Sequence, residues 1–172
     1  DGSVGGLTSP VGGYANSDNV LMARFWNIPT GTKLNYAMNA VNFGPTPAIK
    51  FSHAHRKYLS DPNEDKLEIF VSSNCGATWT SVYNQSGANL ATKVPSDTAF
   101  FPKVNSDWKT TVVALPAFAN TSNVVVRFEM TSGFGNNLFI DDINLQGASA
   151  SIETLTEEGF NVYPNPASEK IN

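Results

Sequence analysis

The chain contains one cysteine, Cys75, among its 172 residues, so it cannot form an intramolecular disulfide. Its stability must therefore come from the burial of apolar side chains or from a bound metal ion. Charged residues are also scarce, at 15% of the chain. Amphipathic helices need many charged side chains on their solvent face. The low charge therefore favours strands joined by polar turns over a helical protein.

A basic surface and a long apolar segment are missing as well. Eleven Lys and Arg residues against fifteen Asp and Glu residues give a formal net charge of -4. Without a basic stripe to contact phosphates, a nucleic-acid partner is disfavoured. No stretch of 18 or more apolar residues occurs, so the sequence predicts no membrane span. Because the chain starts at Asp1 without a signal segment, we expect a mature fragment whose targeting sequence was removed or lies upstream.

The sequence does contain a series of short β-prone segments separated by turn residues. Segments 66–73 and 123–130 alternate apolar and polar side chains with a period of two, as a half-buried strand requires. About eight such segments, and no helical window, predict an all-β fold: a jelly-roll-like antiparallel β-sandwich. The remaining segments are 20–28, 33–42, 48–58, 78–83, 108–115 and 137–145.

The composition changes after Gly147, which we take as the end of a sandwich module over residues 1–147. Residues 148–159 begin with small side chains, continue with acidic ones, and are predicted to form a linker. Residues 160–172 contain two prolines around an asparagine, which fix an extended turn. A strand that begins at Lys170 would have no partner, so we expect the start of a further small β-domain that is truncated here.

Residues 161–168, with Tyr163, Pro164, Asn165 and Pro166 at their centre, resemble the opening of the type A sorting domain of the Bacteroidota type IX secretion system. This resemblance covers only residues 160–172. It implies export across the outer membrane by the type IX translocon and its sorting machinery. The protein would then be secreted or held on the outer cell surface, and the sorting domain would be cleaved off or exchanged for a lipid anchor.

The body of the chain resembles the jelly-roll modules that precede this signal in Bacteroidota surface proteins and secreted metallopeptidases, which are similar in pattern to cleaved-adhesin and MAM-like domains. The resemblance implies a non-catalytic module for adhesion, carbohydrate binding or spacing. The alternative is an accessory C-terminal module of a secreted zinc metallopeptidase or other hydrolase whose catalytic domain lies upstream. A third, less favoured hypothesis makes the chain itself a hydrolase. The matching pieces are 12–17, 65–72, 75–79, Trp108, 126–128 and, most distinctively, 135–145.

Asp141 and Asp142 interrupt the apolar closing strand of this pattern. Neighbouring strand residues point to opposite faces, so at least one of the carboxylates should lie near the core or a sheet edge. A buried carboxylate needs a cation or several hydrogen-bond donors. Asn16, Asp18 and Asp65 could complete a structural calcium site, and in the resembled modules a calcium ion often ties the N-terminal segment to the closing strand. The alternative is that these carboxylates accept hydrogen bonds from backbone amides.

No catalytic site is predicted. His53 and His55 share one strand face, a spacing that zinc sites use, but no third ligand is evident and no H-E-x-x-H motif occurs. We expect both histidines to be semi-buried, with hydrogen-bonded ring nitrogens. Cys75 has no histidine near it in the sequence, and no G-x-S-x-G motif is present.

Exposed aromatic side chains could stack on the apolar face of a sugar. Trp79 and Trp108 belong to the fold pattern, so we expect them in the core. Trp26 and Tyr58 remain as the candidate ligand-binding residues, for a glycan or for a protein of a host or cell surface. Residues 97–99 match a short O-glycosylation pattern of exported Bacteroidota proteins, with Thr98 as the acceptor.

Overall fold

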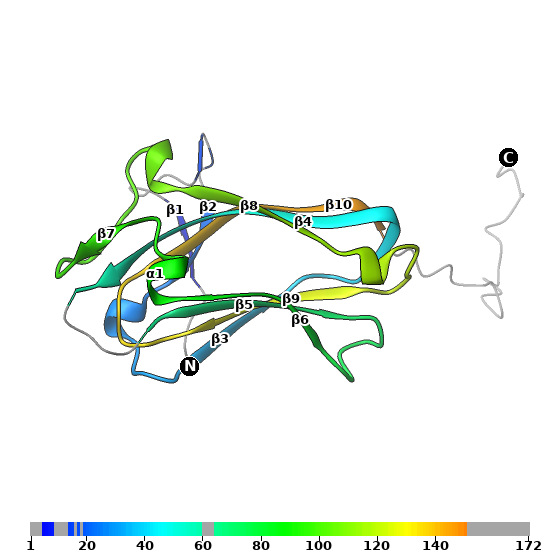
Figure 1. Cartoon of the computed structure of the whole chain (residues 1–172), viewed down its shortest axis with the longest axis horizontal. Coiled ribbons are helices and arrows are strands. Elements are labelled where there is room, and N and C mark those ends of the chain that lie inside the picture. The colour runs from blue at the N-terminus through cyan, green and yellow to red at the C-terminus, as the bar shows by residue number, and fades with distance from the viewer. Residues whose placement is uncertain (1–4, 9–13, 16, 18, 60–63, 151–172) are drawn as a thin grey trace, which may run out of the picture.

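Two β-sheets lie face to face in the computed structural model, which describes residues 5–8, 14, 15, 17, 19–59 and 64–150 (Figure 1). The larger sheet has the order β1 (Gly5–Thr8), β2 (Asn19–Ala23), β10 (Leu138–Ala150), β4 (Val41–Tyr58) and β7 (Lys93–Ser96), and β8 (Lys109–Ala114) also pairs with β4. The smaller sheet has the order β3 (Lys33–Ala37), β9 (Val125–Thr131), β5 (Lys66–Ser72) and β6 (Thr80–Ser86). Among these strands only β4 and β7 pair in parallel. The predicted all-β, jelly-roll-like sandwich is confirmed.

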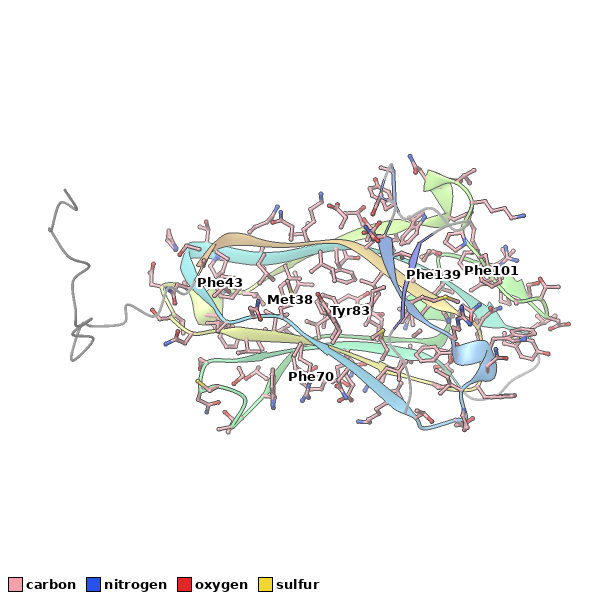
Figure 2. The ribbon with its side chains drawn as sticks, turned by 180° about the vertical axis from the view of Figure 1, so that it is seen from behind. Met38, Phe43, Phe70, Tyr83, Phe101 and Phe139 are labelled. Carbon is pink, nitrogen blue, oxygen red and sulfur yellow. The ribbon has the colours of Figure 1, made fainter. Side chains whose placement is uncertain are left out.

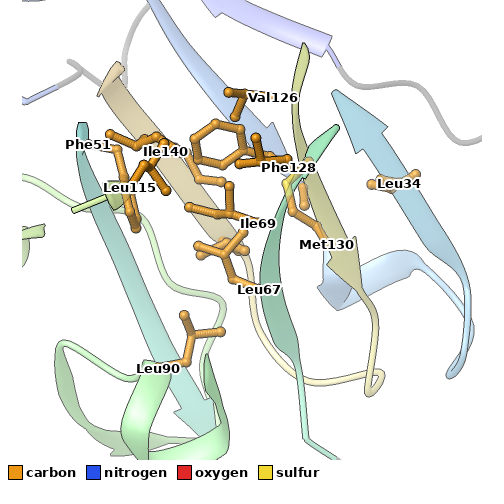
Figure 3. Close-up of a cluster of buried hydrophobic side chains, with 14 of the residues drawn as sticks. Leu34, Phe51, Leu67, Ile69, Leu90, Leu115, Val126, Phe128, Met130 and Ile140 are labelled. Atoms are coloured by element: carbon orange, nitrogen blue, oxygen red, sulfur yellow. The ribbon is translucent and has the colours of Figure 1, made fainter. Parts of the chain in front are cut away.

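Apolar side chains that alternate along the strands fill the space between the sheets (Figure 3). Leu67 and Ile69 of β5 point inward and are fully buried, whereas Phe70 lies on the outer face. Phe51 of β4 contacts Phe128 of β9 edge to face, with ring centroids 5.6 Å apart. Such contacts add about 1 kcal/mol each to the burial of the rings. The packed interior therefore fixes the two sheets against each other.

A second, smaller apolar cluster lies on the outer face of the larger sheet. Phe100 packs there against Phe139, and Trp108 covers them in part. Figure 2 shows Phe101 and Phe139 next to each other in this region, and their ring centroids are 6.0 Å apart. Because this cluster covers one face of β4 and the core covers the other, residues 51–55 are all buried. The last residues of β4 emerge from this covered region at one end of the sandwich.

The strands extend beyond their predicted ends at two places. β4 begins at Val41 and continues through residues 44–47, a Gly-Pro-Thr-Pro stretch that separates the predicted segments 33–42 and 48–58, so the break predicted between these two segments is wrong. Its two prolines are tolerated because the register with β10 shifts there, opposite Gly147, and a β-bulge leaves a ladder position without a hydrogen bond. β10 continues to Ala150, and residues 148–150 of the expected linker pair with residues 41–43 of β4. Residues 151–172 lie outside the described part of the chain.

Helical structure in the described residues is confined to the short helix α1 (Gly87–Leu90) and three single 3-10 turns, η1 (Phe25–Asn27), η2 (Asn105–Asp107) and η3 (Pro116–Phe118). None of these is long or apolar enough to cross a membrane. The position in the sandwich core that was predicted for Trp79 and Trp108 is wrong for both: Trp108 is partly buried against the second cluster, on the outer face of the larger sheet. Trp79 lies half-buried on the outer face of the smaller sheet, with its ring 4.2 Å from the Arg127 guanidinium carbon. Trp79 therefore makes a cation–π contact with Arg127 and does not pack in the core.

Candidate functional site

Trp26 and Tyr58, the two aromatic residues singled out from the sequence, lie in contact. Trp26 belongs to η1 and Tyr58 ends β4, and their ring centroids are 5.5 Å apart in an edge-on arrangement at 80°. Phe134 and Gly135, from the connection between β9 and β10, complete the lining of a hollow of about 190 Å³. We call these four residues the aromatic hollow. It brings together three segments of the chain, of which those of Trp26 and Phe134 are more than 100 residues apart.

The turn that carries Trp26 is fixed to the connection that carries Phe134. Phe25 is fully buried, so η1 is held in the core while Trp26 remains half-exposed. The Ser132 hydroxyl donates to the Ile28 carbonyl at 2.8 Å, and the Gly31 amide donates to the Ser132 carbonyl at 2.7 Å. The two sides of the hollow are therefore joined by hydrogen bonds and not only by ring contacts.

Phe134 is held in an unfavourable conformation. Its φ is +60°, in the left-handed region that bulky side chains avoid, and this costs of order 1–3 kcal/mol. Its side chain is also 52% exposed, so the residue gains little from burial. The sequence pattern leaves residues 131–136 between the predicted strands 123–130 and 137–145, because the exposure and the positive φ of a phenylalanine leave no pattern in a sequence.

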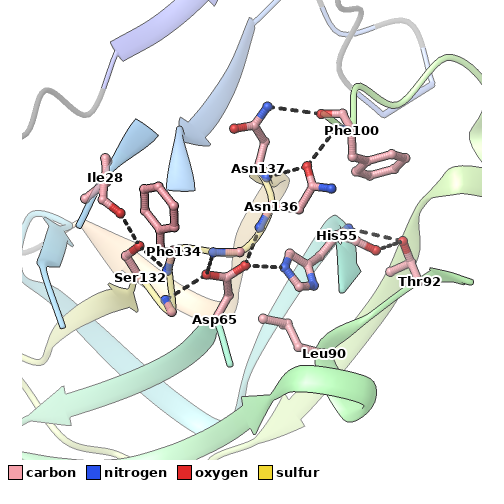
Figure 4. A network of polar contacts seen from close by, with 12 residues as sticks. Ile28, His55, Asp65, Leu90, Thr92, Phe100, Ser132, Phe134, Asn136 and Asn137 are labelled. Atoms are coloured by element: carbon pink, nitrogen blue, oxygen red, sulfur yellow. Dashed lines mark hydrogen bonds and ion pairs between the residues drawn. The ribbon is translucent and has the colours of Figure 1, made fainter. Parts of the chain in front are cut away.

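The carboxylate of Asp65 holds this conformation in place (Figure 4). Its Oδ1 accepts hydrogen bonds from the amides of Gly133 and Gly135 at 2.8 and 3.2 Å, and its Oδ2 accepts one from the amide of Asn136 at 2.7 Å. The His55 Nε2–H donates to the same Oδ2 at 3.0 Å. Both Asp65 and His55 are buried, so these four charge-assisted bonds replace the hydration that the carboxylate has lost.

Gly133 is required for this close approach. A Cβ on residue 133 would lie 2.5 Å from the backbone of Glu64, a separation that real Cβ atoms do not show. The connection therefore passes directly over the start of β5, where Asp65 reaches its amides. We infer that Asp65 is a positioning residue for the aromatic hollow, because it fixes the backbone on both sides of Phe134.

The predicted calcium residues are divided between two parts of the structure. Asp141 accepts a hydrogen bond from the Tyr14 amide at 2.7 Å and a longer one from the Ser17 hydroxyl at 3.4 Å, so it links the N-terminal segment to β10. Asp142 has φ +51° at a bulge in β10 and forms an ion pair with Lys50 at 2.9 Å. Both carboxylates border an open hollow of about 450 Å³. The Asp141 carboxylate accepts hydrogen bonds from the backbone amides of Tyr14 and Asp142, as the alternative to a calcium site predicts.

Asp65 belongs to the other network, where both of its oxygens already accept hydrogen bonds. Asn16 and Asp18 lie outside the described residues. Among the residues that the structure describes, no group of three His, Cys, Asp or Glu side chains is placed to hold a metal ion. Calcium ligands also include carbonyl oxygens and water, so the calcium site stays a prediction.

His53 and His55 are more deeply buried than expected, with no exposed surface. The Nε2–H of His53 donates to the Leu90 carbonyl at 3.0 Å. Burial lowers the pKa of His53 from 6.5 to about 4, while the Leu90 hydrogen bond opposes this shift. Only one ring nitrogen of each histidine forms a hydrogen bond, since neither Nδ1 has a partner among the described residues. Each Nε2 is committed to a protein partner, so the pair serves packing.

Two further predictions concern modification and export. Thr98 is exposed, and its hydroxyl lies 3.0 Å from that of Ser96, in the connection after β7. O-glycosylation of Thr98 stays a prediction. The export motif, Tyr163, Pro164, Asn165 and Pro166, lies outside the described residues.

The fold is shared with adhesin and carbohydrate-binding modules of known structure. No family model matches the chain, and no curated protein matches its sequence. The K1 cleaved adhesin domain of Lys-gingipain from Porphyromonas gingivalis W83 is similar in structure, with a TM-score of 0.55 at 13% identity over 83% of this chain and 82% of that one.

Two similar structures are carbohydrate-binding modules. One is CBM27-1 of Caldicellulosiruptor saccharolyticus in complex with mannohexaose, with a TM-score of 0.55 at 11% identity over 82% of this chain and 80% of that one. The other is TmCBM61 in complex with β-1,4-galactotriose, with a TM-score of 0.51 at 11% identity over 81% and 79% of the two chains. These likenesses show the fold. It is a jelly-roll β-sandwich, of the kind that the resemblance to cleaved-adhesin domains implies.

Proposed function

We propose that the chain is a non-catalytic module that binds a glycan in the aromatic hollow and so serves adhesion or carbohydrate recognition. The observation that carries the proposal is Phe134, an exposed phenylalanine held at positive φ against the Trp26 and Tyr58 pair. Strain and apolar exposure both oppose folding, and the buried carboxylate of Asp65 maintains them. Such costs concentrate where a surface binds a ligand.

The chemistry of the hollow suits a sugar. Aromatic rings offer flat apolar faces to the C–H groups of a pyranose, and the Tyr58 hydroxyl can bond to its hydroxyls. The volume of about 190 Å³ is below the roughly 300 Å³ at which pockets for drug-sized ligands begin. This size favours one sugar unit of a chain as the stacked group. The carbohydrate-binding modules with a similar fold were solved with oligosaccharides, which is consistent with a glycan ligand.

The histidine and the carboxylate behind the aromatic hollow are not arranged for catalysis. His55 and Asp65 lie behind the Phe134 connection and are buried, and both carboxylate oxygens already accept hydrogen bonds. A general base must reach the substrate proton within hydrogen-bond distance. We therefore propose a binding role for the chain itself. The alternative, an accessory module beside an upstream hydrolase domain, is compatible with the same site, and the complete open reading frame would decide between them.

Replacing Trp26 or Tyr58 with alanine is expected to weaken glycan binding about tenfold or more, because each change removes a stacking face worth over 1 kcal/mol. A glycan array identifies the ligand, and isothermal titration calorimetry on wild type and variants measures the loss. Tyr36→Ala is the matched control, since Tyr36 is 39% exposed but lines the separate hollow beside Asp141. Unchanged affinity in both variants, or an array without any ligand, would contradict the proposal.

We also propose that the protein reaches the cell surface through the type IX secretion system of a Bacteroidota cell. The proposal rests on the motif of Tyr163, Pro164, Asn165 and Pro166. In the full-length gene, replacing Pro164 and Pro166 with alanine should leave the protein in the periplasm of the native host. Fractionation and immunoblotting test this, and a surface signal equal to that of wild type would refute export through this motif.

The third proposal is a structural calcium ion held by Asp141 and Asp142 together with Asn16 and Asp18. It is supported by the position of Asp141, which already links the N-terminal segment to β10 through Tyr14. Because an ion that binds only the folded state stabilises it by mass action, chelation with EDTA should lower the melting temperature by several degrees. The Asp141→Asn variant should melt at the same temperature with and without EDTA. A wild-type melting temperature that EDTA does not change removes calcium from the structure.

A further inference from the structure

A second hollow lies beside the aromatic one. Its volume is about 370 Å³, and Arg56, Phe101, Lys103 and Asp107 are among its lining residues. We call these four residues the basic hollow. Arg56 and Tyr58 are two positions apart on β4, roughly 7 Å along the strand, and the pairing of β4 with β7 is irregular between them. The two hollows can therefore be spanned by one extended ligand.

The walls of the two hollows are also tied together by hydrogen bonds. Asn136 follows Gly135 of the aromatic hollow, and its Oδ1 accepts the Phe100 amide at 2.7 Å (Figure 4). Its Nδ2 donates to the Thr98 carbonyl at 2.9 Å. The Asn137 side chain donates to the Phe100 carbonyl at 3.2 Å. The same connection that presents Phe134 thus holds the segment that carries Phe101 and Lys103.

The basic hollow has positive charge in excess. Within the described part of the chain, Arg56 and Lys103 form no ion pair with a carboxylate, although six other Lys and Arg side chains do. The acid in the hollow, Asp107, is already committed: its Oδ1 lies 2.9 Å from Lys93 Nζ, and its Oδ2 accepts the Lys103 amide at 2.8 Å. On a chain with net charge -4, this local excess distinguishes the hollow as a site for an anion.

Arg56 is held in an orientation suited to one kind of anion. Its guanidinium carbon lies 5.1 Å from the centroid of the Phe100 ring, so the plane is supported by a cation–π contact. Its Nε is buried and has no hydrogen-bond partner among the described residues. A planar guanidinium binds a carboxylate through two parallel hydrogen bonds. Phe101, 42% exposed beside it, offers an apolar face to a sugar ring.

From this geometry we infer that the glycan carries an acidic sugar next to the one stacked in the aromatic hollow, with its carboxylate bound by Arg56 and Lys103. The ligand class is a uronate- or sialate-containing oligosaccharide. The inference rests on the proposed function, since the aromatic hollow must bind the neighbouring sugar. It adds a charge requirement that a neutral glycan would not meet.

The test compares acidic glycans with their own methyl esters, which keep the sugar chain and remove the charge. The probes are trigalacturonate, a hyaluronan tetrasaccharide and sialyllactose, each as acid and as ester, chosen after an array that contains all common carboxylated sugars. We expect the preferred acid to bind at least about tenfold tighter than its ester at low salt. This advantage should shrink as NaCl is added, because salt screens the charges.

Variants assign the effect to the basic hollow. Arg56→Gln and Lys103→Gln should each reduce the affinity for the acid more than the affinity for the ester, so that the acid-to-ester affinity ratio falls toward one. Lys103 is exposed, so its variant keeps the fold even where Arg56→Gln loses packing on Phe100. Lys109→Gln is the matched control: Lys109 is also an exposed cation without an ion pair in the described residues, but it lines neither hollow.

The outcomes separate the inference from the proposed function. Equal binding of acid and ester, lost in Trp26→Ala, overturns the charge requirement and leaves the aromatic hollow supported. Failure of every glycan, neutral or acidic, overturns both. Acid binding that Arg56→Gln and Lys103→Gln leave intact also overturns the inference, because the carboxylate would then be bound elsewhere.

Discussion

The Asp65→Ala variant is expected to lose about 3–5 kcal/mol of its free energy of unfolding, the usual cost of removing one partner from a buried charged network. The change leaves the amides of Gly133, Gly135 and Asn136, and the His55 Nε2–H, without their acceptor. A buried donor that loses its partner also loses access to water, so the full desolvation penalty applies. Urea denaturation followed by tryptophan fluorescence measures the difference.

Glycan binding should also weaken in the Asp65→Ala variant, even under conditions where the protein stays folded. Asp65 fixes the backbone on both sides of Phe134, so without the carboxylate the strained conformation relaxes. Glu64→Gln is the matched control, since the neighbouring carboxylate is half-exposed and pairs with Lys57 at 3.3 Å. It should change stability by less than about 1 kcal/mol. If Asp65→Ala proves as stable as this control, the carboxylate does not hold the connection.

Much of this sandwich could be predicted from the sequence because the signals are local. The alternation at residues 66–73 and 123–130 reports directly on one buried and one exposed face, and both segments are strands of the smaller sheet. A second local signal misled the prediction at residues 44–47. Two prolines there indicate the end of a strand, but β4 continues through them. There the partner strand β10 provides a bulge that accommodates them, and such a partner cannot be identified from the local sequence.

The candidate site was predictable only in part, for a related reason. Trp26 and Tyr58 stood out as aromatic residues not assigned to the core, but their contact joins η1 to the end of β4. Phe134 gave no signal, because its exposure depends on hydrogen bonds to Asp65, which lies about 70 residues earlier in the chain. Asp65 was noticed as an oxygen ligand for a cation. Its partners are instead N–H donors, and residue type alone does not distinguish these two environments.

A second large effect is expected from pH, through His53. Burial lowers the pKa of His53 from 6.5 to about 4 in the folded protein, whereas an unfolded chain keeps the ordinary value. Between pH 6.5 and 4 the unfolded state therefore binds a proton that the folded state does not, and folding stability falls as the pH falls. The shift corresponds to about 3 kcal/mol across this window, with no effect of His53 above it.

The contribution of His53 can be separated from that of other groups with His53→Gln. Glutamine does not titrate, and its side-chain amide can still donate to the Leu90 carbonyl that the histidine contacts at 3.0 Å. Free energies of unfolding measured by urea titration at several pH values should fall less steeply below pH 6.5 in the variant than in wild type. Because every other titrating group is common to both proteins, the difference between the two curves belongs to His53. Parallel curves would show that His53 is protonated in the folded state as readily as in the unfolded chain, and that its burial between Phe51 and Leu90 is looser than the structure indicates.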